Sequence, residues 1–147
     1  MSSSGACHAQ YPGYPGPPTP GSCFYFHRLT RAHLKDPHSR YTPQAWYLGQ
    51  FGFTGFYIAY GNTYVSKMAV GVYLSNGNEP LRRPIRCRIT VLDMSGKDKE
   101  DLVLVDETMD SVGAWARGAE VTIKFKEISK FSNEKGSLLF RYDTEWC

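Results

Sequence analysis

The chain has 147 residues, of which 41% are hydrophobic and 14% aromatic, enough for one buried core and too apolar for wholesale disorder. Its formal net charge of +3 falls well short of the strong basic field typical of a dedicated nucleic-acid binder. No uninterrupted apolar run approaches the roughly 18 residues of a spanning helix. We therefore expect one core and no membrane span.

The four cysteines are widely spaced, without a CxxC pair, and the start MSSSGACHAQ lacks the basic and apolar regions of a signal peptide. These features predict a cytoplasmic chain with reduced thiols. The cysteines are Cys7, Cys23, Cys87 and Cys147.

Residues 1–22 are rich in Ser, Gly and Pro and contain YPGYPGPP. Proline removes backbone donors and fixes φ, so we predict a disordered Pro/Gly-rich tail. A ligand for an SH3- or WW-type groove is the alternative, but PGPPTP has no flanking basic anchor, which favours a linker. Residues 23–147 are then a single domain.

The first predicted strand is Cys23–Arg28, and the basic segment LTRAHLKDPHSR after it is expected to form a loop with one helical turn, stopped by Pro37. One cysteine and three histidines here suggest a zinc site. They are Cys23, His27, His33 and His38. Their spacing, C-x3-H-x5-H-x4-H, matches no standard zinc finger, so we expect no metal and no cofactor.

From Tyr41 the apolar residues recur with a period of two, which indicates strands. Phe56, Ile58 and Tyr60 are predicted to share one face, and because both faces are apolar this strand is expected to be central and covered on both sides. In the next strand Met68, Val70, Val72 and Leu74 are expected on one face, with Ala69, Gly71 and Tyr73 on the other. The small residues at 69 and 71 should leave a shallow floor beside Tyr73.

The second half of the chain continues the alternation. We expect the core to receive Cys87, Ile89, Val91, Val121, Ile123, Phe125, Leu138, Phe140 and Tyr142. Solvent should receive Arg86, Arg88, Thr90, Leu139 and Arg141. Residues 101–107 read as a returning strand, and ISKFSNEKG as a loop. The sequence therefore predicts an all-β fold, an antiparallel β-sandwich of seven to eight short strands.

The segment TMDSVGAWARG, residues 108–118, has no strand period and carries a tryptophan. Irregular loops that present an aromatic residue are common binding sites. Packing as an anchor for its own loop is the alternative for Trp115.

The order of these motifs resembles the TRAF domain, the β-sandwich of the tumour necrosis factor receptor-associated factors, and the wider meprin-and-TRAF-homology (MATH) class. The resemblance covers roughly residues 23–147 and follows an ordered set of segments. These are TPQAWYLGQFGF, FYIAYGN, VGVYL, NGNEPLRRPIRCRITVLD, VTIKFKEISKF and SLLFRYDTEW. The seven-in-absentia ubiquitin ligases share this sandwich, but the zinc-binding portion expected there is missing from the sequence.

The resemblance implies a non-enzymatic adaptor that binds short extended peptides of receptor tails or ubiquitination substrates along the edge of the sandwich. Tyr60 falls where receptor-binding members place a peptide-contacting tyrosine, and Tyr73 where MATH substrate adaptors have an aromatic groove floor. Ile58 replaces an arginine of several members. The family's serine-rich segment corresponds to Ser111, Val112, Gly113 and Trp115. Its missing hydroxyls predict a more apolar ligand than the acidic consensus.

Other readings of these residues remain open. Tyr60 and Tyr73 are equally compatible with ordinary strand aromatics. A structural or assembly protein is the main alternative, and because a proline-rich tail cannot sustain heptads we expect at most a weak homo-oligomer. Nucleic-acid binding would rest on Arg82, Arg83, Arg86 and Arg88, which a solvated loop also explains. No nucleophile–base motif is present, which argues against an enzyme.

Overall fold

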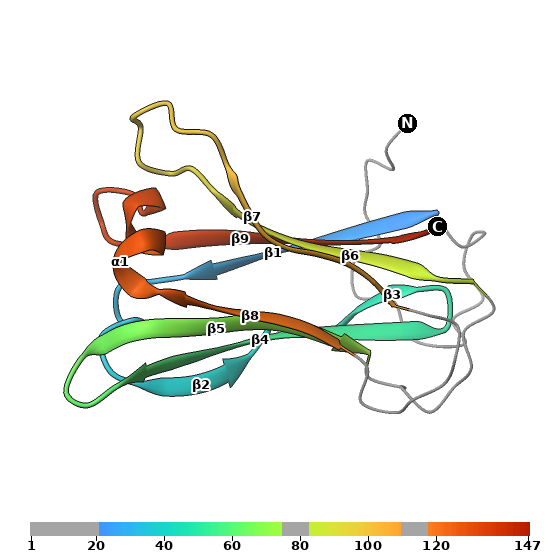
Figure 1. Ribbon diagram of the computed structural model, residues 1–147, viewed down its shortest axis with the longest axis horizontal. Helices are drawn as coiled ribbons and strands as arrows, with labels where there is room; N and C mark the ends of the chain where they lie inside the picture. Colours follow the sequence, from blue (N-terminus) through green and yellow to red (C-terminus); the bar gives the residue numbers. More distant parts are fainter. Residues whose placement is uncertain (1–20, 75–82, 110–117) are drawn as a thin grey trace.

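The structure is a computed structural model, and it describes residues 21–74, 83–109 and 118–147. In these ranges nine strands form two antiparallel sheets that pack face to face (Figure 1). The strands are β1 (Ser22–Leu29), β2 (His38–Tyr41), β3 (Trp46–Leu48), β4 (Phe51–Gly61), β5 (Val65–Leu74), β6 (Ile85–Leu92), β7 (Leu102–Met109), β8 (Gly118–Lys124) and β9 (Leu138–Trp146). The predicted all-β sandwich is confirmed, with nine described strands rather than seven or eight.

The strand order shows how the chain alternates between the two layers. One sheet has the order β1-β9-β6-β7, and the other the order β2-β4-β5-β8, with β3 also pairing with β4. In the parts of the chain that the structure describes, β1, β7 and β8 each pair along one side only. These edges therefore keep backbone groups that no described strand uses.

The two longest strands, β4 and β5, follow the predicted alternation. Tyr57 and Met68 are at most 1% exposed and point into the core, whereas Phe56 and Ile58 are half-buried and Tyr60 is exposed. The strand β4 is central, as predicted, but the described residues leave its second face partly open. The expectation of a cover on both sides is therefore wrong for the part of the chain described.

The strands β6 and β9 place their apolar residues as predicted, with one exception. Thr90, expected in solvent, is only 9% exposed. Thr90 still lies on the outer face, because Ile89 and Val91 on either side of it are fully buried. It pairs with the outward Arg141 of β9 and lines a hollow together with Arg88, so neighbouring side chains cover it. Leu139 and Arg141 lie outward and half-buried.

After β8 the structure departs from the predicted strand and loop. The helix α1 (Phe125–Ile128) and the 3-10 helix η1 (Ser129–Phe131) follow directly, so Phe125 belongs to a helical turn. Ile128 is fully buried in this turn. A period of two would have placed Ile128 and Phe125 on opposite faces, whereas one helical turn brings residues three apart to the same side.

Two short strands were not predicted. The strand β2 is almost entirely exposed, and its residues His38–Tyr41 pair with Ala59–Phe56 of β4. Because it is polar and follows a proline, only the neighbouring strand identifies it. The strand β3 contributes Trp46, which is completely buried and stacks on Tyr25 with 5.1 Å between ring centroids.

The cysteines behave differently from one another. Cys87 is fully buried, as predicted, and burial raises the pKa of its thiol to about 12. Cys147 is an exposed free thiol. Cys23, by contrast, is disulfide-bonded, so the expectation of reduced thiols is wrong for this residue. No helix in the described ranges is long and apolar enough to cross a membrane.

Candidate peptide-binding face

The candidate site lies on the outer face of the β2-β4-β5-β8 sheet, which is the side that points away from the other sheet. Strand register places Phe56 opposite Gly71 and Ile58 opposite Ala69 on this face. Tyr73 follows two residues after Gly71 on the same side. The predicted grouping of the outward residues of β4 and β5 is therefore confirmed.

An aromatic cluster forms the centre of this face. Tyr73 contacts Tyr41 of β2 at 6.0 Å and Phe56 of β4 at 6.3 Å between ring centroids. Tyr41 is 65% exposed. The Tyr41–Tyr73 contact is edge to face, which is a favourable geometry, and the Phe56–Tyr73 contact is tilted. The cluster leaves apolar surface in reach of a ligand.

The shallow floor predicted beside Tyr73 is filled by a side chain of the neighbouring strand. A Cβ added at Gly71 would stand 2.4 Å from Cζ of Phe56, so the Phe56 ring lies across the glycine and fills that space. Hollows remain on both sides of the cluster. One, of about 280 Å³, lies between Tyr73 and β2, and the other, of about 250 Å³, lies between Tyr73 and Gly118–Glu120 of β8.

Tyr60 lies on the same face but far from this cluster. It pairs with Lys67, whose ammonium lies 5.3 Å from the Tyr60 ring centroid. Tyr73 is six residues further along β5 than Lys67, which is about 20 Å at the rise of an extended strand. The two predicted tyrosines therefore belong to one face, at opposite ends, and not to one pocket.

The other predicted contacts, Ser111, Val112, Gly113 and Trp115, lie outside the described residues. The first described residue after them is Gly118, which pairs with Tyr73 across β5 and β8. Ile58 is half-buried between Phe56 and Tyr60 on the outer face. It adds apolar surface to this face.

The sequence analysis did not identify Tyr41 as a member of the aromatic cluster. Its strand is short, polar and preceded by Pro37, so no hydrophobic period indicated that Tyr41 would face the same way as Phe56. The pairing of Tyr41 with Phe56 across β2 and β4 supplies that information. The four residues of β2 are too few to establish a period from the sequence.

The histidines suggested for zinc make other contacts. His38 donates from Nδ1 to the carbonyl oxygen of Asp36 at 2.7 Å. Its Nε2 accepts a hydrogen bond from the Tyr57 hydroxyl at 2.6 Å. His33 accepts a hydrogen bond from the Thr30 amide at 3.0 Å. Burial lowers the pKa of His27 to about 4. Within the described ranges, no three His, Cys, Asp or Glu side chains lie close enough to hold a metal ion.

Most of the arginines considered for nucleic-acid binding form hydrogen bonds within the protein. Arg86 makes two hydrogen bonds to the carboxylate of Asp106, at 2.8 and 2.7 Å, and Arg88 shares the same carboxylate at 3.2 Å. Arg83 donates to the Cys147 carbonyl at 2.6 Å, and Arg82 lies outside the described residues. Paired cations leave less charge for phosphates.

Comparison with known protein-family models gives no match for this chain, and comparison with curated protein sequences gives none either.

Proposed function

We propose that the chain is a non-enzymatic protein-interaction domain of TRAF/MATH type, which binds short extended peptides along the outer face. One observation supports this above all: the Tyr41–Phe56–Tyr73 cluster lies beside β8, an edge strand that the described residues pair on one side only. A peptide that adds to such an edge gains main-chain hydrogen bonds. Every second side chain of that peptide would then point to the outer face, on the side of Tyr73.

In this proposal the two tyrosines have separate roles. Tyr73 borders both hollows, so it would contact an apolar anchor side chain of the ligand. Tyr60, about 20 Å away along the strand direction, would contact a second residue of the same peptide. A ligand that reaches both tyrosines must span at least about six extended residues.

The ligand chemistry follows from the face. Phe56, Ile58 and Tyr73 present apolar surface, which favours apolar side chains over the acidic consensus of the resembling family. Receptor tails and ubiquitination substrates are the proposed sources of such peptides, and a signalling or ubiquitin-pathway adaptor is the corresponding role. Ser111, Val112, Gly113 and Trp115 remain predicted contacts of the same peptide.

Assembly through the sandwich itself is the second candidate function, and the edge strand β1 favours it. Phe24 and Phe26 stand edge to face at 5.3 Å, and the Arg141 guanidinium lies 4.5 Å from the Phe24 ring centroid. Phe26 is 45% exposed. Exposed strand edges with apolar side chains are templates for pairing with another chain.

The test is a titration of the full chain with an array of extended eight-residue peptides, apolar and acidic, followed by isothermal titration calorimetry. We expect saturable binding of apolar peptides and at least a roughly ten-fold loss of affinity in Tyr73→Ala, since a buried aromatic contact of this kind is worth more than 1 kcal/mol. Light scattering of the same samples reports self-assembly.

Tyr64→Ala is the matched control, because Tyr64 is 73% exposed in the turn between β4 and β5 and lies outside the aromatic cluster. Its affinity should equal that of the unaltered chain. Equal affinity in folded Tyr73→Ala would remove Tyr73 from the site. A folded chain that binds no peptide but forms oligomers would replace the adaptor proposal with assembly.

A further inference from the structure

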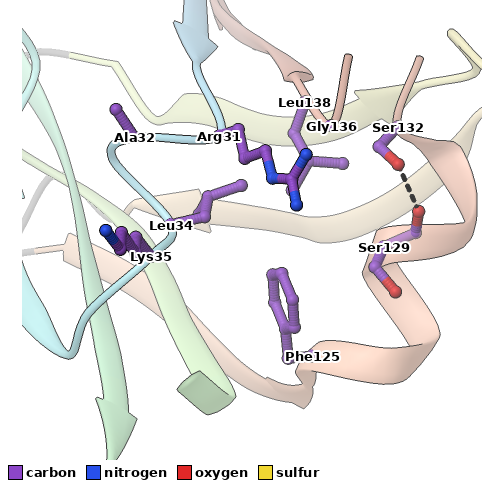
Figure 2. A pocket seen from close by; sticks show the side chains of 9 residues that line it. All are labelled: Arg31, Ala32, Leu34, Lys35, Phe125, Ser129, Ser132, Gly136 and Leu138. Carbon is purple, nitrogen blue, oxygen red and sulfur yellow. Dashed lines mark hydrogen bonds between the residues drawn. The ribbon is translucent and has the colours of Figure 1, made fainter. Parts of the chain in front are cut away.

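A separate cavity is lined in part by α1 and does not include Tyr73. The helix α1 stands at one end of the sandwich (Figure 1). Its volume is about 690 Å³, larger than either hollow of the peptide-binding face. One wall is the turn that follows β1, and the other is formed by α1 and the residues after it (Figure 2). The proposed peptide contacts do not use it.

Both walls are held in place by local hydrogen bonds. In the turn, the Leu34 amide donates to the Thr30 and Arg31 carbonyls at 3.3 and 3.1 Å, and His33 accepts from the Thr30 amide. Opposite, the Ser132 hydroxyl donates to the Ser129 carbonyl at 2.7 Å (Figure 2). The cavity is therefore preformed rather than dependent on a ligand.

The inside of the cavity is apolar. Leu34 is 9% exposed, Leu138 is fully buried, and the half-buried Phe125 presents its ring to the space between them (Figure 2). The deeper surface thus suits a hydrocarbon group.

The rim of the cavity carries two cations, Arg31 and Lys35. A Cβ added at Gly136 would stand 3.3 Å from the Arg31 Cβ, so the aliphatic stem of Arg31 packs on the glycine. Its guanidinium extends over the cavity (Figure 2). Neither cation forms an ion pair with the described residues. The Lys35 nitrogen points away from the space between Arg31 and Phe125 (Figure 2), so Arg31 is the cation placed for a ligand.

We infer that this cavity binds a small amphiphile with one anionic head group, a carboxylate or a phosphate monoester, and an acyl or alkyl chain. The head group would accept paired hydrogen bonds from Arg31, whose planar fork matches both anions. The chain would lie against Leu34, Phe125 and Leu138.

Size and surroundings favour a small molecule over a peptide. Small-molecule sites have volumes of roughly 300–1,000 Å³, and this cavity falls in that range. Its walls are a turn, a helical segment and the first residue of β9, which is paired on both sides by β1 and β6. No open strand edge lines it, so an extended peptide would find no main-chain partners there.

The experiment is isothermal titration calorimetry of the full chain with decanoate and decyl phosphate below their micelle concentrations, and with decan-1-ol below its solubility limit. We expect saturable binding of at least one anion and at least roughly ten-fold weaker binding of the alcohol, because a hydrogen bond to a charged group is lost. The anion that binds more tightly identifies the head group.

Arg31→Gln retains most of the stem on Gly136 and removes the charge, so it should weaken anion binding by a similar factor without affecting the alcohol. Arg28→Gln removes an exposed arginine of β1 that does not line the cavity, and it should bind like the unaltered chain. Amide NMR shifts on titration should concentrate at Ser129 and Ser132. No saturable anion binding, equal affinity for the alcohol, or an unchanged Arg31→Gln would each overturn the inference.

Discussion

The two outer faces of the sandwich are built by the same alternation and differ in what they expose. On the β1-β9-β6-β7 sheet, the outward arginines pair with carboxylates, as Arg86 and Arg88 do with Asp106 and Arg141 does with Asp143. On the β2-β4-β5-β8 sheet, the outward residues at the centre are aromatic. The first face pairs these arginines internally and exposes an aromatic side chain at its β1 edge, where Phe26 lies. The second face exposes apolar area at its centre, which gains free energy when a ligand covers it.

This contrast indicates where recognition should occur. Exposed ion pairs contribute little free energy because water and salt screen them. A partner that displaced Asp106 from its arginines would also have to replace the hydrogen bonds that Asp106 accepts. The Tyr41–Phe56–Tyr73 cluster makes no such demand on a partner. The difference can be tested by disturbing each face in turn and comparing the effects on stability and on peptide affinity.

The largest effect is expected from Gly71→Ala. The added Cβ would stand 2.4 Å from Cζ of Phe56 and 2.9 Å from the carbonyl oxygen of Ala119. The ring can rotate away, but the carbonyl belongs to the β8 backbone, so β5 and β8 must separate slightly. We expect a loss of about 1–3 kcal/mol in the free energy of unfolding, as for other overpacked sites, measured by urea denaturation.

The same variant should lose most of its peptide affinity, because the displaced Phe56 ring would enter the hollows beside Tyr73. Gly21→Ala is the matched control, since no atom lies within 4 Å of the Cβ it would gain. It should leave both stability and affinity unchanged. Gly71→Ala with unaltered stability would show that the Ala119 carbonyl of β8 does not stand against the glycine.

The sequence predicted the strands whose apolar residues recur with a clear period, and it failed where neighbours decide. The alternation in β4 and β5 correctly placed Phe56, Ile58 and Tyr73 on one side. It gave no indication of β2, because a four-residue polar strand is defined by its pairing with β4. The position of Tyr41 in the cluster depends on that pairing.

The candidate site was less accessible to prediction than the fold. The small residues at 69 and 71 predicted a shallow floor beside Tyr73. The Phe56 side chain, directly opposite Gly71, fills that space. A pattern along one strand cannot show what a side chain on the next strand does. The end cavity is a further example, because residues 31–35 and 125–138 meet only through the tertiary fold.

A smaller effect is expected from Tyr57→Phe, which tests the attachment of β2 to the aromatic face. The carbonyl of Asp36 can only accept, so Nδ1 of neutral His38 carries the proton and Nε2 accepts from the Tyr57 hydroxyl at 2.6 Å. Removing this bond should lower the free energy of unfolding by about 0.5–1.5 kcal/mol, measured by urea denaturation.

Peptide affinity should fall less in Tyr57→Phe than in Gly71→Ala, because the substitution loosens β2 and Tyr41 but leaves Phe56 and Tyr73 in place. Tyr64→Phe removes an exposed hydroxyl from the same residue type and serves as the control. A loss of affinity as large as that of Gly71→Ala would show that β2 contributes more to the site than the ring contacts indicate.

The smallest effect is expected from Asp106→Asn on the charged face. The hydrogen bonds from Arg86 are the largest cause that lowers the pKa of Asp106, from 3.8 to about 2. A carboxyl with a lowered folded-state pKa stabilises the protein above its unfolded value and loses that contribution as the pH falls through its folded value. The stability difference between the unaltered chain and Asp106→Asn should therefore be present at pH 7 and shrink between about pH 4 and pH 2.

Urea denaturation at pH 7, 4 and 2, in low and high salt, measures this difference. High salt should reduce it at pH 7, because Asp106 is an exposed partner whose attraction to Arg86 and Arg88 is screened. Glu134→Gln removes an exposed carboxylate that has no ion pair with the described residues and should show no such pH dependence. Peptide affinity should be the same in both variants, because neither residue lies on the aromatic face. A loss of affinity in Asp106→Asn alone would place recognition on the charged face and reverse the contrast between the two sheets.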